Sequence, residues 1–144
     1  KKLQNKMSRD SRLSTAIHLL MLLWGKKGEL VQSDYIASSV NTNPVVIRRL
    51  IGQLKEAGIV EVVAGKNGGC RLLKSAEHIS MWDVFIAVQN PQLFFKNKNE
   101  PNKECPIGCK INDCLNQYYD DLQDTLMSKM KKDTLLSLIT EQVL

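Results

Sequence analysis

No apolar run in this sequence is long enough to cross a lipid bilayer. The longest, Leu19 to Trp24, is far shorter than the ~20 residues that a spanning helix needs. The sequence also lacks a basic segment followed by an apolar stretch and a small-residue cleavage site. We therefore expect a cytoplasmic protein with no membrane partner. The basic segment Lys1–Lys6 precedes Met7, which we interpret as the natural initiator, and we base no fold prediction on that segment.

Aromatic residues and histidines are scarce, at 6% of the chain and two residues respectively. The sequence contains no Cys–His pairing, no nucleophile elbow and no phosphate-binding loop, so we do not expect an enzyme. Hydrophobic residues make up 43% of the 144 positions, which is enough for the core of one ordinary domain with an appended arm. The formal net charge of +5 and the pI of about 9.1 favour a polyanionic partner if the cations gather on one surface.

Three helices are predicted in the first part of the chain. Apolar residues recur at helical spacing from Ser11 to Trp24, and a glycine-containing break follows. A second, short helix is expected within Val31–Val40, with Ser33 as its N-cap. A third helix is expected from Pro44 to Ala57. Asn43 can cap it by accepting a hydrogen bond from a free backbone N–H group, and a proline at the first helical position loses no hydrogen bond.

The third helix has two chemically different faces, and Gly58 is expected to end it in a left-handed conformation. One face is apolar and consists of Ile47, Leu50, Ile51 and Leu54. The opposite face carries Val45, Arg48, Arg49 and Gly52. Two short helices joined by a tight turn, with arginines pointing outward, fit a helix-turn-helix. They fit equally well a helical hairpin with a solvated charged face.

The following segment favours the helix-turn-helix. Ile59–Leu73 is predicted to form two strands around a glycine-rich turn, Ala64–Gly69. A recognition helix followed directly by a β-hairpin is a winged helix-turn-helix. Lys66 and Asn67 would lie at the tip of the wing, where a cation can meet phosphate oxygens. Gly68–Gly69 would allow the backbone to approach a groove closely.

Three more helices are predicted in the last part of the chain: a capped helix, a long amphipathic helix and a short final helix. Ser80 is expected to cap a helix within Ile79–Val88, and the polar segment Asn90–Lys103 is predicted to be a loop. A long amphipathic stripe follows, formed by Ile111, Leu115, Tyr118 or Tyr119, Leu122, Leu126 and Met130. The stripe can pack on its own domain or on a second copy, and its length favours the second copy. A final helix is expected at Thr134–Val143.

These patterns predict a mainly α protein. A winged helix-turn-helix domain with a small β-hairpin wing is expected over residues 7–90. A loop carrying cysteines is expected over residues 91–110, and a long C-terminal dimerisation helix with a last short helix over residues 111–144.

Several short runs resemble the Rrf2 family of bacterial winged-helix repressors. They are Ser11–Leu13, Lys55–Val60 and Ile79–Val84, and the resemblance extends over essentially the whole chain after its first six residues. The family includes the iron–sulfur regulator IscR, the nitric-oxide regulator NsrR and the cysteine-metabolism regulator CymR. The runs Val40–Arg49 and Pro101–Gly108 look like its YwnA-type branch.

The resemblance implies a homodimer crossed through the long helix, with each helix-turn-helix and wing on double-stranded DNA. Two-fold symmetry implies a pseudo-palindromic operator with half-sites one helical turn or a multiple apart. Some members insert a wing arginine into the minor groove, and Ala64 stands at that position here. Our candidate DNA contacts are the outward residues of the third helix, the helix N-termini and the wing, namely Ser33, Asn43, Val45, Arg48, Arg49, Lys66, Asn67 and Arg71.

Three of the four cysteines, Cys105, Cys109 and Cys114, lie just before and at the start of the predicted long helix. A helix N-terminus lowers the pKa of a nearby thiol, and Lys103 and Lys110 add positive charge. One interpretation is redox sensing, in which Cys105 is oxidised and then trapped as a disulfide by Cys109 or Cys114. The other is that the thiols have no sensing role. In the YwnA-type branch the cysteine that matches Cys105 typically stands without the other two.

The cluster-binding relatives carry three cysteines in the same segment, so a [2Fe-2S] cluster held by Cys105, Cys109 and Cys114 is the alternative. The spacing here is narrower than theirs, and no fourth ligand is evident. Leu115–Gln117 follow where IscR has a histidine, and the resemblance places Ser14 where NsrR-like members have an acidic residue. We therefore expect no metal or cofactor.

The functional prediction is a DNA-binding transcriptional regulator, a homodimeric repressor controlled by oxidation of cysteine thiols. One alternative is a regulator of the same fold that senses through an iron–sulfur cluster. The other is a thiol or iron–sulfur redox module that docks on proteins instead of DNA.

Overall fold

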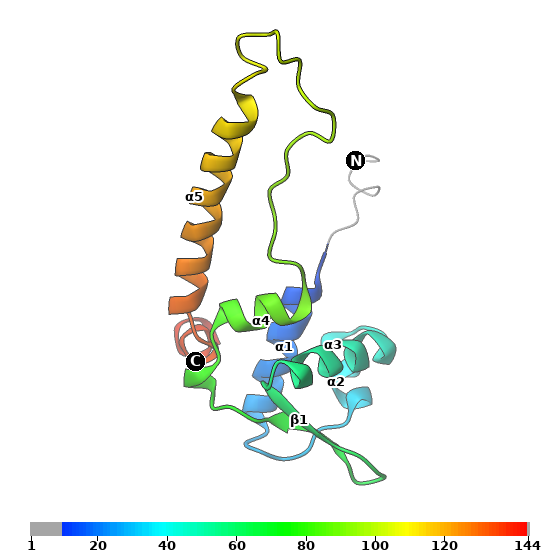
Figure 1. The fold of residues 1–144 in the computed structure, drawn as a ribbon. Helices are drawn as coiled ribbons and strands as arrows, with labels where there is room; N and C mark the ends of the chain where they lie inside the picture. Colours follow the sequence, from blue (N-terminus) through cyan, green and yellow to red (C-terminus); the bar gives the residue numbers. More distant parts are fainter. Residues whose placement is uncertain (1–9, 144) are drawn as a thin grey trace.

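The computed structural model describes residues 10–143, so the predictions for Lys1–Lys6 and Met7 lie outside the described residues. A body of short helices carries a protruding β-hairpin at one end, and a single long helix rises from the other end (Figure 1). The helices and strands in chain order are α1 (Arg12–Gly25), α2 (Ser33–Val40), α3 (Pro44–Glu56), β1 (Val60–Val63), β2 (Gly69–Leu72), η1 (Ala76–His78), α4 (Met81–Val88), α5 (Ile111–Lys132), α6 (Leu135–Leu138) and η2 (Ile139–Val143). The mainly helical fold with a two-stranded hairpin confirms the predicted fold class.

The helix-turn-helix pair is built on one apolar core. The predicted inner face of α3, formed by Ile47, Leu50, Ile51 and Leu54, is buried throughout. It packs with the buried residues of α1, such as Leu19 and Leu20, and with Ile36 of α2. Asn41 links α2 to α3 in a left-handed conformation, with φ of +62°. Asparagine tolerates this conformation better than most residues, which explains the tight turn.

The two ends of α3 form as the sequence predicts. The Asn43 side chain accepts a hydrogen bond of 2.9 Å from the backbone N–H of Val45, and Pro44 occupies the first helical position. Beyond the other end, Gly58 adopts φ of +74° and turns the chain into β1. Both ends depend on local backbone chemistry, so a short stretch of sequence is sufficient to specify them.

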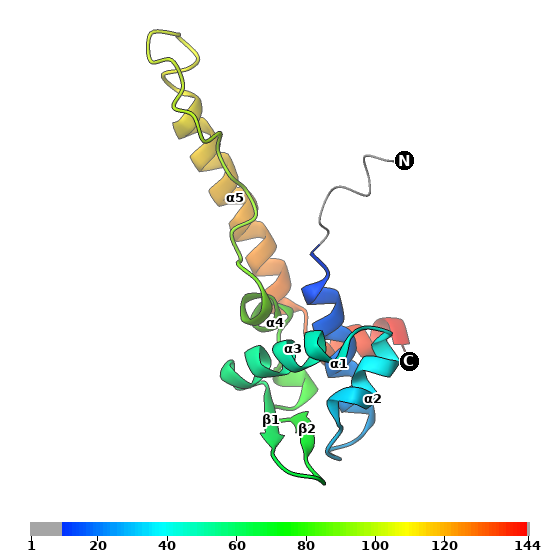
Figure 2. The ribbon, with the colours of Figure 1, turned by 90° about the vertical axis from the view of Figure 1, so that its right-hand side faces the viewer.

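The hairpin is attached to the helical body by an isolated β-bridge between Cys70 and Val31. β1 and β2 pair in antiparallel register, with Val62 opposite Cys70. Cys70 then exchanges two backbone hydrogen bonds of 2.9 Å with Val31, the residue just before α2. Cys70 is a buried residue of β2. Because of this bridge, the wing is held in a definite position relative to the helix-turn-helix (Figure 2).

The C-terminal elements α6 and η2 complete the same core, and the chain just before them lies beside the start of α4. The Ser80 side chain caps α4 by accepting from the backbone N–H of Asp83 at 3.0 Å, as predicted. Next to it, the backbone N–H of Met81 donates to the carbonyl of Asp133 at 2.8 Å. Leu135 and Ile139 are buried in the core of the helical body. The last helix therefore completes the N-terminal body, and the boundaries predicted for the three segments remain a prediction.

The long helix α5 lies largely outside this core, although Met130 near its C-terminal end packs against it. None of its described side chains is buried. The segment between α4 and α5 runs alongside it, and the two views agree on this placement (Figures 1 and 2). Phe94 stacks on Tyr119 with ring centroids 5.6 Å apart, and Gln123 donates to the carbonyl of Pro91 at 2.6 Å. Among the described helices, none has the length and hydropathy needed to cross a membrane.

Candidate nucleic-acid interface and cysteine segment

The outer face of α3 presents the predicted contact residues to solvent. Val45 is 54% exposed, and the Arg48 and Arg49 side chains are exposed on the same helix. They point outward because the opposite face of this helix is taken up by the core. A rigid helix with exposed guanidinium groups is suited to the major groove of DNA, where arginine can bond two acceptors of a guanine.

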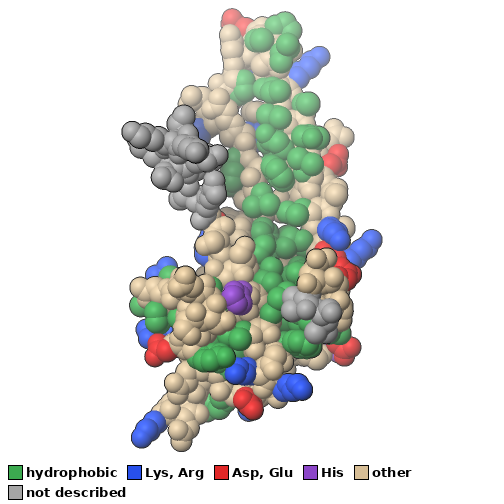
Figure 3. All heavy atoms as spheres, turned by 180° about the vertical axis from the view of Figure 1, so that it is seen from behind, with side chains coloured by type: hydrophobic (Ala, Val, Ile, Leu, Met, Phe, Trp, Pro, Cys, Tyr) green, Lys and Arg blue, Asp and Glu red, His purple; other side chains and the backbone are tan. Residues whose placement is uncertain are grey.

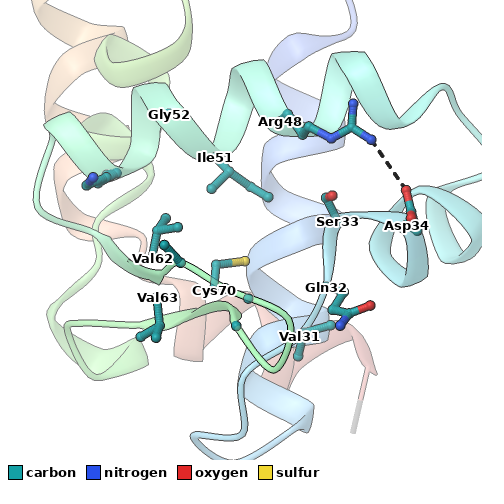
Figure 4. A pocket seen from close by; sticks show the side chains of 15 residues that line it. Val31, Gln32, Ser33, Asp34, Arg48, Ile51, Gly52, Val62, Val63 and Cys70 are labelled. Atoms are coloured by element: carbon teal, nitrogen blue, oxygen red, sulfur yellow. Dashed lines mark ion pairs between the residues drawn. The ribbon is translucent and has the colours of Figure 1, made fainter.

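The start of α2 differs from the prediction in one respect. The predicted N-cap, Ser33, is the first helical residue, and Gln32 occupies the N-cap position with φ of −76° and ψ of 148°. No side-chain hydrogen bond caps this helix. The Gln32 amide instead donates to the backbone carbonyl of Lys66 at 3.3 Å. Gln32 therefore contributes to positioning the wing, and Ser33 remains half-buried beside α3 (Figure 4).

The wing carries Lys66 and Asn67 at its exposed turn, as predicted. The two glycines that follow also have a role within the protein, and their predicted approach to a groove stays a prediction. A Cβ atom on Gly68 would lie 2.0 Å from the carbonyl oxygen of Val63, and one on Gly69 would lie 2.7 Å from that of Val31. Gly68 is therefore required by close packing inside the hairpin, and Gly69 by close packing against Val31 just before α2. Any side chain at either position would collide with backbone atoms.

Arg71 lies on β2 directly opposite Glu61 of β1. Its Nε and Nη2 atoms donate to Glu61 Oε1 at 2.9 and 2.6 Å. The pair is partly buried against the hairpin, so this guanidinium already has a protein partner. Its predicted role as a phosphate contact stays a prediction and requires Arg71 to share or exchange that partner.

A cleft of about 630 Å³ lies between α3 and the wing (Figure 4). Apolar residues such as Ile51 and Val62 line this cleft, together with the charged side chain of Arg48. Three further polar residues that the sequence analysis did not include among the contacts also line it: Gln32, Asp34 and Lys55. Lys55 lies in the last turn of α3, and Asp34 in the first turn of α2. The sequence could predict that these polar side chains are exposed. It could not predict that all three line one cleft.

Cations outnumber carboxylates on the surface formed by α3, the start of α2 and the wing. The five cations are Arg48, Arg49, Lys55, Lys66 and Arg71, and the three carboxylates are Asp34, Glu56 and Glu61. A surface of this sign, with a helix and a hairpin side by side, can neutralise phosphates and release their counterions. The arrangement supports contact with a nucleic-acid duplex.

The three clustered cysteines are all exposed and free. Cys105 lies in a turn before α5: its backbone carbonyl accepts from the backbone N–H of Cys109 at 3.1 Å. The backbone N–H groups of Gly108 and Ile107 hold the pKa of the Cys105 thiol below its usual value. The lowered pKa of Cys105 is thus caused by this local turn. It is not caused by the N-terminus of α5, which begins six residues later at Ile111.

The other cysteines have different surroundings. The Cys109 thiol donates to the carbonyl of Pro106 at 3.4 Å, and Cys114 lies in the first turns of α5. Burial raises the pKa of Cys70 to about 11, which leaves this thiol protonated and unreactive at neutral pH. Among the thiols of the chain, Cys105 therefore has the surroundings that favour the thiolate.

The cysteine segment does not fit a metal cluster as it stands. Over residues 10–143, no group of three or more His, Cys, Asp or Glu side chains is placed to hold a metal ion. A [2Fe-2S] cluster needs four ligands, and the three thiols lie exposed along a turn and a helix.

Comparisons with known proteins agree with this geometry. The profile of the Rrf2 family, described as iron-dependent transcriptional regulators, matches residues 9–141. The proposed HTH-type transcriptional regulator YwnA of Bacillus subtilis is 41% identical over 130 residues, which cover 88% of this chain and 96% of YwnA.

Solved structures show the same fold. The crystal structure of a proposed DNA-binding protein has a TM-score of 0.72 at 36% identity, covering 90% of this chain and 99% of its own. CymR, the global cysteine regulator of B. subtilis, has a TM-score of 0.69 at 17% identity, covering 93% of this chain and 97% of its own.

Proposed function

The chain belongs to the Rrf2 family of transcriptional regulators, and we propose that it is a homodimeric repressor that binds double-stranded DNA and responds to thiol oxidation. The observation that carries the proposal is the surface on which α3 and the wing lie side by side. Arg48 and Arg49 extend from the recognition helix, and Lys66 lies at the wing tip. This is the arrangement in which a helix reads base edges while a wing contacts the backbone.

The proposed dimer rests on the unburied face of α5. This helix of 22 residues is about 33 Å long, yet buries none of its side chains in the single chain. Hydrophobic side chains form a nearly continuous band along it when the molecule is seen from behind (Figure 3). Tyr118 is 58% exposed on this helix, whereas its neighbour Tyr119 is covered by Phe94. A second copy of α5 would cover the band and place two recognition helices on one duplex.

DNA binding is tested first by selecting duplexes from a random-sequence library with the purified protein. Affinity for a selected duplex is then measured by fluorescence anisotropy over a salt series. Arg49→Ala is expected to weaken binding of the selected duplex strongly, because a bidentate arginine contributes ~1–3 kcal/mol of discrimination. Lys66→Ala is expected mainly to reduce the salt slope, by ~0.9 for one lost phosphate contact.

Lys98→Ala is the matched control for charge, because Lys98 lies in the loop between α4 and α5 and should leave both quantities unchanged. Selected duplexes with an inverted repeat would support the two-fold arrangement. Unchanged binding for both Arg49→Ala and Lys66→Ala would refute this docking of α3 and the wing. Failure of the parent protein to bind any duplex would favour a redox module that docks on proteins.

The proposed signal is an oxidant of the peroxide class. The thiolate of Cys105 attacks hydrogen peroxide, forming a sulfenic acid and releasing hydroxide. The thiol of Cys109 or Cys114 then attacks the sulfenic sulfur, which forms a disulfide and releases water. A disulfide next to the start of α5 would favour one arrangement of the paired helices over another. DNA binding would change by the free-energy difference between those arrangements.

The redox proposal is tested by titrating the selected duplex with reduced and with peroxide-treated protein. The parent protein should change affinity after oxidation, and Cys105→Ser should not. Cys70→Ser is the control, because that thiol is buried. A Cys105→Ser variant that responds as the parent does would place the switch elsewhere.

The cluster alternative is favoured by the iron-dependent description of the family and is tested independently. Protein purified without oxygen is examined by absorption spectroscopy together with iron and sulfide assays. A colourless, iron-free protein with four titratable thiols supports the thiol-based proposal. Visible bands with bound iron and sulfide would overturn it and assign Cys105, Cys109 and Cys114 as ligands.

A further inference from the structure

An ion pair joins the two helices of the helix-turn-helix at the surface proposed to meet DNA. Arg48 Nη2 on α3 lies 3.5 Å from Asp34 Oδ1 in the first turn of α2. The two side chains remain 58% and 75% exposed, and both line the cleft beside the wing (Figure 4). The carboxylate therefore lies where DNA phosphates would approach, next to a candidate base-reading arginine.

We propose that Asp34 is a positioning residue for DNA specificity: it holds the Arg48 guanidinium in place for a base edge and disfavours its contact with phosphate. The proposal rests on the DNA binding proposed above and deepens it, because it names a residue that decides between specific and nonspecific binding.

The Arg48 guanidinium has more donors than its contact with Asp34 uses. A guanidinium has five N–H donors in a planar fork, and an arginine side chain has many rotamers when free. The contact with Asp34 joins one guanidinium nitrogen to one carboxylate oxygen, so the remaining donors stay available. An exposed ion pair adds little to folding stability, so its main consequence lies in fixing the direction of Arg48 before DNA arrives.

The negative charge of Asp34 acts on DNA phosphates as well as on Arg48. Without Asp34, Arg48 could turn to the nearest phosphate, a contact that every DNA sequence offers. The carboxylate repels phosphates and competes with them for the same guanidinium. A guanine edge is not subject to this repulsion, since it presents two neutral acceptors to arginine in the major groove. Asp34 should therefore weaken binding to random DNA more than binding to a selected duplex.

Asp34 has one other effect that the experiment must separate. A carboxylate in the first turn of a helix also stabilises that helix through its dipole. A purely structural role would change the midpoint of thermal unfolding and lower both affinities together. A positioning role changes the ratio of the two affinities, and does so only when Arg48 is present.

The experiment measures affinity for a selected duplex and for a random-sequence pool of the same length, at several salt concentrations. Asp34→Asn keeps the shape of the side chain and removes its charge. It is expected to tighten binding to the random pool and to lower the ratio of selected to random affinity by about tenfold, the size of one good base contact. Glu56→Gln, at the C-terminal end of α3, removes the same charge and should leave the ratio unchanged.

The double variant Asp34→Asn/Arg48→Ala completes the cycle. In the Arg48→Ala background, Asp34→Asn should no longer change the ratio, because the residue it acts through is absent. An unchanged ratio for the single variant, or a loss that persists in the Arg48→Ala background, overturns the proposal while DNA binding by the parent stands. A parent protein that does not discriminate between the two pools overturns the proposed function and this inference together.

Discussion

The exposed ring of Tyr118 offers a quantitative test of the proposed α5 pairing. A fully covered tyrosine buries on the order of 200 Å², so its exposed 58% corresponds to about 120 Å². Covering half or all of this area at ~25 cal/mol per Å² is worth about 1.5–3 kcal/mol per copy. Both copies lose this stabilisation in a symmetric dimer. Tyr118→Ala should therefore raise the dimer dissociation constant by about 10²- to 10⁴-fold.

The assay is light scattering after size-exclusion chromatography over a dilution series, or sedimentation velocity. Tyr118→Phe retains the ring and should dimerise nearly as the parent does. Asp120→Ala changes an exposed residue on the opposite side of α5 and should also have little effect. A parent protein that is monomeric at the highest concentration, or a Tyr118→Ala variant with the parent's dissociation constant, would refute the pairing through this face.

Four further predictions concern α3, the wing and the cysteine thiols. Asn43→Ala should lower the free energy of unfolding by ~1 kcal/mol in urea denaturation, because it removes the cap of α3. Gly69→Ala should destabilise the protein by more than ~1 kcal/mol, because its φ of +154° and the backbone 2.7 Å from an added Cβ leave no room. Gly52→Ala, with nothing within 4 Å, should instead stabilise α3 by ~0.5–1 kcal/mol. Alkylation by iodoacetamide, followed by mass spectrometry over a pH series, should label Cys105 at lower pH than Cys70. The pKa of the Cys105 thiol is lowered, whereas that of Cys70 is raised to about 11, and only the thiolate reacts.

Much of the helical body was predictable because its signals are local. The Asn43-Pro44 start of α3, the left-handed Gly58 after its end and the Ser80 cap of α4 each depend on side chains within three residues of the backbone they serve. The apolar period of α3 likewise named its buried face correctly, since a helix places every third or fourth residue on one side.

The errors and open points involve residues far apart in the sequence. The Ser33 cap prediction was wrong by one residue, and the actual N-cap residue, Gln32, instead reaches the wing at Lys66. The wing glycines were predicted to allow close approach to a groove, which stays a prediction, and the structure shows in addition that Gly69 is required by its contact with Val31. The stripe on α5 left Tyr118 and Tyr119 as alternatives, and the contact between Phe94 and Tyr119 leaves Tyr118 as the open residue.

By itself, the sequence determined the order of the elements, the outward face of α3 and the resemblance to a regulator family, because capping, turn chemistry and hydrophobic period act over a few residues. The tertiary structure alone decided which charged side chains converge. Asp34 of α2 lies next to Arg48 of α3, and Arg71 of β2 lies next to Glu61 of β1. Such pairs depend on how packed elements cross, and that geometry follows from the shape of the whole core.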